Sequence, residues 1–139
     1  MQVDFSFICD YAEATNKINA LGIGFDTIIA PQVPTRHPTF FLVIQMRATV
    51  VEAGDKNFEV DLIDEDGKQV IPPLKGKITI PRPASGTEST GRIAMRFDNV
   101  EFPRYGAYSI HALVEGHEMT RIPLNVRRPP SVLPGQGGA

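Results

Sequence analysis

The side chains that could carry chemistry include a single cysteine, Cys9. It ends a run in which every second residue is apolar, and in such a pattern cysteine acts as a small buried hydrophobe. A catalytic thiolate needs a neighbouring histidine or a helix N-terminus that favours the charged form. Because no catalytic motif surrounds Cys9, we expect a structural role. A thiol-dependent enzyme using Cys9 is the weakest of three functions that we consider.

Aspartates near the expected strand ends offer a second chemistry, since calcium takes about six to eight hard oxygen ligands. The candidate ligands are Asp26, Asp64, Asp66 and Asp98. The best local fragment, Asp64-x-Asp66-Gly67, lacks the further ligands and the closing glutamate of an EF-hand loop. Asp-Gly is also what a tight hairpin turn requires. We therefore expect a turn, no metal and no cofactor, and keep a small-ligand or calcium-binding sandwich as the alternative function.

The histidines and serines show no catalytic arrangement in the sequence. The three histidines are His37, His111 and His117, and no pair has metal-ligand spacing on one strand face, so zinc is not expected. No serine sits in the sequence context of a nucleophile elbow. Gly22-x-Gly24 is followed by strand-like residues rather than by the helix that a phosphate loop needs. We expect that the protein is not an enzyme.

The elements that must position these side chains are predicted to be β-strands. The plainest signal lies in Phe102–Val126, where apolar residues alternate with polar ones on both sides of a turn over Glu115–Glu118. Period-two patterning joined by a short turn with glycine predicts a β-hairpin. Its lead-in, Gly106-x-Tyr108, resembles the last hairpin of immunoglobulin-like sandwiches.

The rest of the chain repeats this rhythm. Strands are predicted at residues 2–9, at 18–29 as two short strands around a kink, and at 39–51, 58–62, 68–71, 75–80 and 91–100. Asp10–Lys17 favours a single helical turn, and Pro31–Pro38 and Pro81–Thr90 are predicted loops. About eight or nine short strands predict an antiparallel immunoglobulin-like β-sandwich over residues 1–127. Residues 128–139, rich in proline and glycine, are predicted to be a flexible tail.

The longest predicted strand, Thr39–Val51, is apolar on both faces. Phe41, Val43 and Val51 lie opposite the face that we assign to the core. Such a strand is either covered on both sides, here by a loop such as Pro31–Pro38, or forms an interface. These three residues are our interface candidates. The leading function is a non-enzymatic protein-interaction or self-association module of the β-sandwich type.

Composition narrows the partners and the location. The net charge is -2 and the basic residues are scattered, whereas a duplex-binding surface needs a basic stripe. We therefore expect a protein partner or a homo-oligomer and no nucleic acid. No apolar stretch approaches the length of a membrane span and the N-terminus lacks the pattern of a signal peptide. We expect no membrane contact and a cytoplasmic location.

Several blocks of the sequence resemble a family of small bacterial proteins of unknown function. The resemblance lies in Phe7-x-Cys9-Asp10-Tyr11-Ala12 and in the block from Lys17 to Asp26 that includes Leu21-Gly22-x-Gly24. It continues in Asp64-x-Asp66-Gly67 and Phe102-Pro103-x-x-Gly106-x-Tyr108. It spans roughly Gln2 to Val126. The resemblance implies an all-β cytoplasmic domain of bacterial or phage origin, with no assigned activity and no catalytic residue to carry over.

Overall fold

A computed structural model describes residues 1–131, and within them it contains ten β-strands and one short 3-10 helix, η1 (Val50–Glu52). This confirms the all-β class. The strands are β1 (Gln2–Cys9), β2 (Tyr11–Ala14), β3 (Ile18–Leu21), β4 (Thr27–Ile29), β5 (Thr35–Thr49), β6 (Gly54–Asp64), β7 (Leu74–Ile80), β8 (Glu88–Phe102), β9 (Gly106–Val114) and β10 (His117–Arg127). The predicted tail begins after β10, and its residues 132–139 lie outside the described part of the chain.

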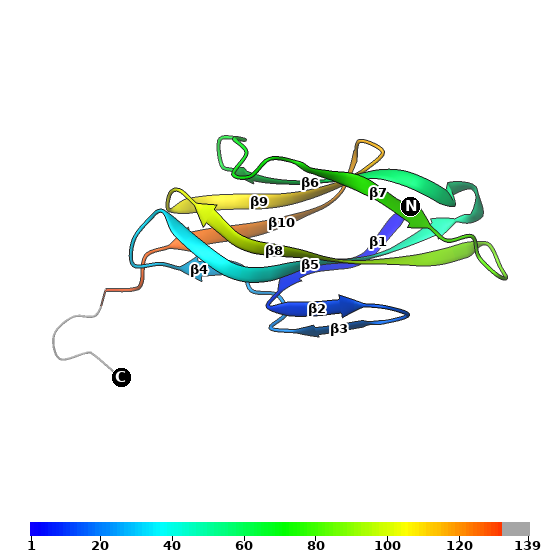
Figure 1. The fold of residues 1–139 in the computed structure, drawn as a ribbon, viewed down its shortest axis with the longest axis horizontal. Coiled ribbons are helices and arrows are strands. Elements are labelled where there is room, and N and C mark those ends of the chain that lie inside the picture. The colour runs from blue at the N-terminus through cyan, green and yellow to red at the C-terminus, as the bar shows by residue number, and fades with distance from the viewer. Residues whose placement is uncertain (132–139) are drawn as a thin grey trace.

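The strands form three sheets (Figure 1). A three-stranded sheet has the order β1-β5-β8, a five-stranded sheet has the order β4-β10-β9-β6-β7, and β2 and β3 form a separate hairpin beside the three-stranded sheet. Every pairing is antiparallel except one, since β4 runs parallel to β10 and pairs Ile28 with Val126. The expectation of a purely antiparallel fold is therefore wrong at this edge.

The main core lies between the two larger sheets, where alternate residues of each strand point inward. β5 contributes Phe40, Leu42, Ile44 and Met46, all at most 1% exposed. Phe40 stacks on Phe97 of β8 with ring centres 4.8 Å apart. Leu62 of β6 and further residues of β9 and β10 close the core from the five-stranded sheet.

Two local predictions in the N-terminal half are wrong. Asp10–Lys17 forms no helical turn: Tyr11–Ala14 is strand β2, paired with β3. The preference of a few residues for a helix stabilises a single turn by only tenths of a kcal/mol. Strand pairing, in contrast, buries Ala12 to 3% exposure. β5 also starts at Thr35, inside the predicted Pro31–Pro38 loop.

The C-terminal hairpin is confirmed, with a shorter turn than predicted. His117 pairs with Val114, so the turn is Glu115-Gly116 alone, with both residues at positive φ. Two residues at positive φ match the twist of the strands they connect. The shorter turn moves Glu118 into β10, and this places its side chain beside β9. The strand predicted at residues 68–71 is reduced to a single bridge between Ile63 and Gln69.

Candidate functional site

The apolar side chains on the outer face of β5 are covered by the chain itself. Phe41 is 9% exposed and Val43 is fully buried. They pack with Cys9 and Ala12 in a second cluster, to which the hairpin also contributes Ile18. The cover is therefore the β2–β3 hairpin and not the Pro31–Pro38 segment. We withdraw Phe41 and Val43 as interface candidates because no partner reaches buried side chains.

Val51 occupies a different environment. It lies in η1 and is 86% exposed, so its side chain is open to solvent. Phe41 and Val43 are buried under the hairpin, and the three predicted interface residues therefore form no common surface.

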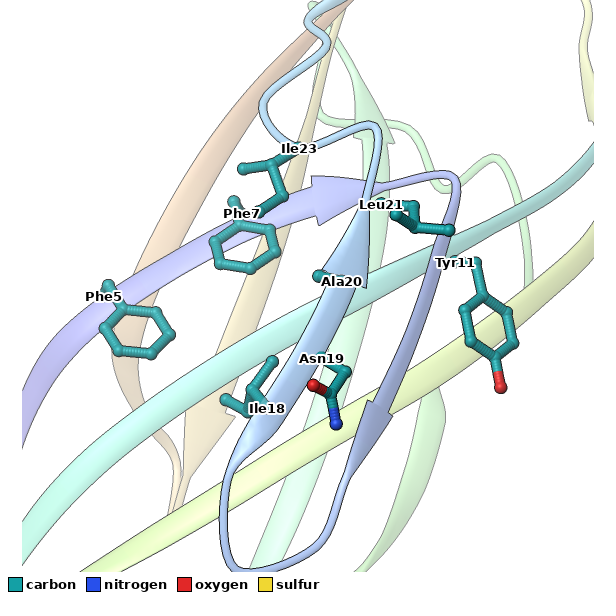
Figure 2. Close-up of a pocket in the computed structure, with 8 residues that line it drawn as sticks. All are labelled: Phe5, Phe7, Tyr11, Ile18, Asn19, Ala20, Leu21 and Ile23. Atoms are coloured by element: carbon teal, nitrogen blue, oxygen red, sulfur yellow. The ribbon is translucent and has the colours of Figure 1, made fainter.

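Four of the eight large apolar residues that are exposed in the described chain lie together, at an open groove between β1 and the β2–β3 hairpin (Figure 2). The groove has a volume of ≈ 620 Å³ and is lined by Phe5, Phe7, Tyr11, Ile18, Asn19, Ala20, Leu21 and Ile23. Leu21 is 68% exposed, Ile23 60%, Tyr11 49% and Phe5 39%. Large apolar side chains grouped at such exposure mark a binding surface more often than isolated ones do.

Figure 2 shows how the groove is built. Phe5 and Phe7 lie on β1, Ile18 and Ala20 lie on β3, and Tyr11 lies on β2, the other strand of the hairpin. The two phenylalanine rings stack with centres 5.9 Å apart. Asn19 is the single amide of the lining, and it donates a hydrogen bond to Glu13 Oε1 at 3.4 Å. The lining offers apolar contact and little reactive chemistry.

The strand beside the groove, β3, has an unpaired edge in the described part of the chain. β3 pairs with β2 alone, and its residues Ile18–Leu21 carry no charge and no proline. Two other edge strands, β7 and β8, are protected by charge, and a third, β4, is only three residues long; both features keep an edge from pairing with other chains. β7 carries Lys75 and Lys77, and β8 carries Arg92 and Arg96. The free edge of β3 could therefore pair with a strand of another chain.

A second arrangement lies on the outer face of the five-stranded sheet. The Oγ atom of Ser109 lies 2.7 Å from Nε2 of His111, and Nδ1 of His111 is hydrogen-bonded to Oε1 of Glu118. This bond to His111 is the main cause that lowers the pKa of Glu118. The sequence predicted none of these partners. The sequence does place Ser109 and His111 on one face of a strand. Only the correct two-residue turn, however, brings Glu118 next to His111.

Charged residues of neighbouring strands face the same histidine. Asp61 of β6 and Arg121 of β10 are both register partners of His111. Burial, followed by the neighbouring carboxyl group of Glu59, raises the pKa of Asp61. The Oδ1 atom of Asp61 is buried and has no protein hydrogen-bond partner. The centre of this face is therefore a polar cluster, whereas the groove is apolar.

The four candidate calcium ligands do not converge. Asp64 accepts hydrogen bonds from the backbone N–H groups of Asp66 and Lys68, each at 2.9 Å, and from Arg104 Nη2 at 2.8 Å. Asp98 lies on β8 and pairs with Arg96, and Asp26 precedes β4. Within residues 1–131 no three His, Cys, Asp or Glu side chains are grouped as metal ligands.

The environment of Cys9 disfavours a thiolate. The residue is fully buried and its Sγ–H donates to the carbonyl oxygen of Tyr11 at 3.4 Å. Burial raises the pKa of the thiol, because a charged sulfur is poorly solvated there. Cys9 therefore fits the structural role that its pattern indicates.

One solved structure similar to this chain is Pseudomonas fluorescens alkylpurine DNA glycosylase AlkC bound to DNA containing an abasic site analogue. The sequences are 12% identical with a TM-score of 0.42, and the match covers 73% of this chain and 27% of the glycosylase. The chain thus spans about a quarter of that protein's length. At this level the similarity carries no argument about activity. No curated protein matches the chain.

The similar structure is a DNA complex, and the prediction that excluded nucleic acid from the partners is therefore withdrawn. A match at this TM-score says nothing further about the partners of this chain. Within residues 1–131, no helix has the length and apolar character that a membrane crossing requires. The cytoplasmic location stays a prediction.

A family profile accounts for most of the chain. It matches residues 4–127, from β1 to the end of β10, and its family is described as one of unknown function. This confirms the resemblance to an uncharacterised family. The matched range includes the groove, the β2–β3 hairpin and the polar cluster around His111. The chain belongs to the family of unknown function DUF6941.

Proposed function

We propose that this protein is an immunoglobulin-like interaction module that self-associates by pairing the free edge of β3 with β3 of a second copy. The observation that carries the proposal is the uncharged β3 edge beside an apolar groove whose Leu21 and Ile23 are more than half exposed. Pairing of this kind supplies main-chain hydrogen bonds, while the side chains of the added strand fill neighbouring pockets.

Three features support the immunoglobulin-like part of the proposal. β1, β5 and β8 form one sheet, and β10, β9, β6 and β7 follow one another in the second. The hydroxyl of Tyr108 donates to the carbonyl oxygen of Arg104 at 2.6 Å and accepts from its N–H at 3.2 Å. This is the hydrogen-bonding pattern of a tyrosine corner, which occurs at the same place in immunoglobulin-like sandwiches.

A second copy suits the groove because of its chemistry. Two β3 edges related by a twofold axis present the same residues to each other, which is how most homodimers are built. The segment Ile18–Leu21 carries no charge, so its approach to a copy of itself meets no like-charge repulsion. A hairpin of two strands is marginal alone, and pairing extends it to four strands.

The test is light scattering across a concentration series, with Leu21→Lys and Ile23→Lys as variants. Both side chains are exposed in the single chain, so the variants fold normally. We expect a concentration-dependent dimer in the wild type and at least a tenfold weaker dimer in Leu21→Lys, since a buried unpaired charge costs more than about 1.4 kcal/mol.

Val51→Lys is the matched control. Like Leu21 and Ile23, Val51 is an exposed aliphatic side chain, but it lies in η1, outside the groove lining. We expect the dimer to persist unchanged in this variant. A wild type that stays monomeric at all concentrations, or a dimer weakened equally by Val51→Lys and Leu21→Lys, contradicts the proposal.

A further inference from the structure

Three side chains on the outer face of the five-stranded sheet form a continuous chain of hydrogen bonds. Ser109 and His111 lie two residues apart on β9 and therefore point to the same face. The 2.7 Å contact joins Ser109 Oγ to His111 Nε2, and Nδ1 of the same ring is bonded to Glu118 of β10. Their order, serine to histidine to carboxylate, is that of a catalytic triad. None of the three lines the groove.

The carboxylate selects the tautomer of the histidine. The pKa of Glu118 is lowered, so Glu118 is ionised near neutral pH and accepts hydrogen bonds without donating any. Nδ1 of His111 must then carry the proton. The lone pair of Nε2 is left facing the Ser109 hydroxyl, which is the arrangement that lets histidine remove a proton from serine.

The two ends of the chain differ in access to solvent. His111 is only 7% exposed, so its hydrogen bonds compete little with water. Ser109 is half-buried and Glu118 is exposed. The histidine is therefore held in place, while the serine is at the surface of the sheet where an incoming group can meet it.

We propose that Ser109 is a nucleophilic serine that accepts an acyl group from a carboxylic ester, with His111 as general base and Glu118 as the positioning residue. Oγ of Ser109 attacks the carbonyl carbon and its proton passes to Nε2 of His111. The C–O bond to the leaving alcohol breaks, and the alcohol takes that proton. Water then attacks the acyl group in the same way and releases a carboxylic acid, which restores Ser109.

Charged residues of the neighbouring strands surround the imidazole of His111. Asp61 from β6, with Glu59 beside it, places acidic groups next to the imidazole, and these favour the imidazolium that forms. Arg121 of β10 stands opposite His111 in the register, with its Nη2 3.8 Å from Glu118 Oε1.

A fluorophosphonate probe tests the nucleophile on the full-length protein. Ser109 Oγ displaces fluoride from phosphorus, and the adduct is located by mass spectrometry of peptides. We expect a single adduct on Ser109, none in Ser109→Ala, and labelling about 100-fold slower in His111→Asn, which is the usual contribution of a general base. Ser6→Ala is the control, because Ser6 bonds to Thr120 and not to a histidine. It should react at the wild-type rate.

The role of Glu118 is tested by replacing its carboxylate. In Glu118→Gln we expect labelling of Ser109 to slow, because an amide does not fix the Nδ1 proton as a carboxylate does, and in Glu118→Asp, which keeps a carboxylate, we expect the rate to recover in part. Asp61→Asn changes a neighbouring carboxyl group outside the chain of hydrogen bonds, and it should react at the wild-type rate. A wild type without an adduct, an adduct on another residue, or a His111→Asn rate equal to the wild-type rate overturns the proposal. Mapping the wild-type adduct decides the matter even if Ser109→Ala fails to fold.

Discussion

At the scale of single residues, the carboxylate of Asp64 holds a turn together and does not belong to a calcium site. Both of its oxygens are occupied, by two backbone N–H groups of the turn and by Arg104. Hydrogen bonds to the charged form favour ionisation, so the backbone N–H of Lys68, followed by that of Asp66 and by Arg104, lowers the pKa of Asp64. A carboxylate so engaged has little capacity left for a metal ion.

This lowered pKa predicts a pH-dependent stability. A depressed folded-state pKa stabilises the protein above the ordinary aspartate pKa of about 3.9, and the contribution is lost as pH falls through the folded value. We expect Asp64→Asn to be less stable than the wild type at pH 7, and the difference to shrink below about pH 4. Urea unfolding at several pH values measures both.

Asp66→Asn is the control for this prediction. Its carboxylate is 3.7 Å from the same Arg104 but is 75% exposed, and exposed ion pairs contribute little. Its stability should follow the wild type at all pH values. A difference between Asp64→Asn and wild type that does not change with pH contradicts the assignment.

At the scale of elements, the β2–β3 hairpin decides which surfaces exist. It lies in sequence between β1 of the three-stranded sheet and β4 of the five-stranded sheet, and it covers Phe41 and Val43 while leaving its own far edge free. Its position depends on the return segment after β3, where Gly22 has φ +68° beside Asp10. A Cβ at residue 22 would lie 2.1 Å from Oδ2 of Asp10.

This close approach predicts that Gly22→Ala is costly. Positive φ alone costs an alanine about 1–2 kcal/mol, and the contact with Asp10 adds to that. Gly24→Ala is the matched control, since Gly24 has φ +82° and nothing lies within 4 Å of its added Cβ. Urea unfolding should show a larger loss of unfolding free energy for Gly22→Ala than for Gly24→Ala. Equal losses would show that Asp10 moves away freely.

At the scale of the whole molecule, β5 joins two apolar clusters of unequal size. Leu42 faces the main core between the sheets, and its neighbours Phe41 and Val43 face the small cluster under the hairpin. The groove and the polar cluster around His111 lie on the outer faces of different sheets. Self-association at β3 therefore leaves Ser109 uncovered. The proposed dimer and the proposed nucleophilic serine can be tested independently of each other.

The two clusters predict two levels of stability along one strand. Leu42→Ala should lower the global unfolding free energy by about 2–5 kcal/mol, as is usual for buried leucine. Phe41→Ala should mainly loosen the hairpin, because local opening follows the number of buried contacts. Hydrogen exchange measured by mass spectrometry should then rise in residues 11–21 far more than in β6 and β9. A uniform rise across the chain would contradict this.

The sequence alone determined the strands that carry a clear period of two, including β1 and the C-terminal hairpin, as well as the all-β class. It also identified β5 as apolar on both faces. These features are local, since a strand's pattern is written in its own residues. The same kind of reasoning could not place Glu118, because a two-residue error in the turn moved it out of β10.

Only the tertiary structure decided what covers Phe41 and Val43, which strand runs parallel to β10, and which groups meet His111. Each of these depends on pairings between distant segments, such as Phe7 with Val43 and Asp61 with His111. Strand pattern limits which face is apolar, but it does not specify the neighbour that packs against that face. The groove at β3 and the bond between His111 and Glu118 both arise from such pairings, and for that reason neither was visible in the sequence.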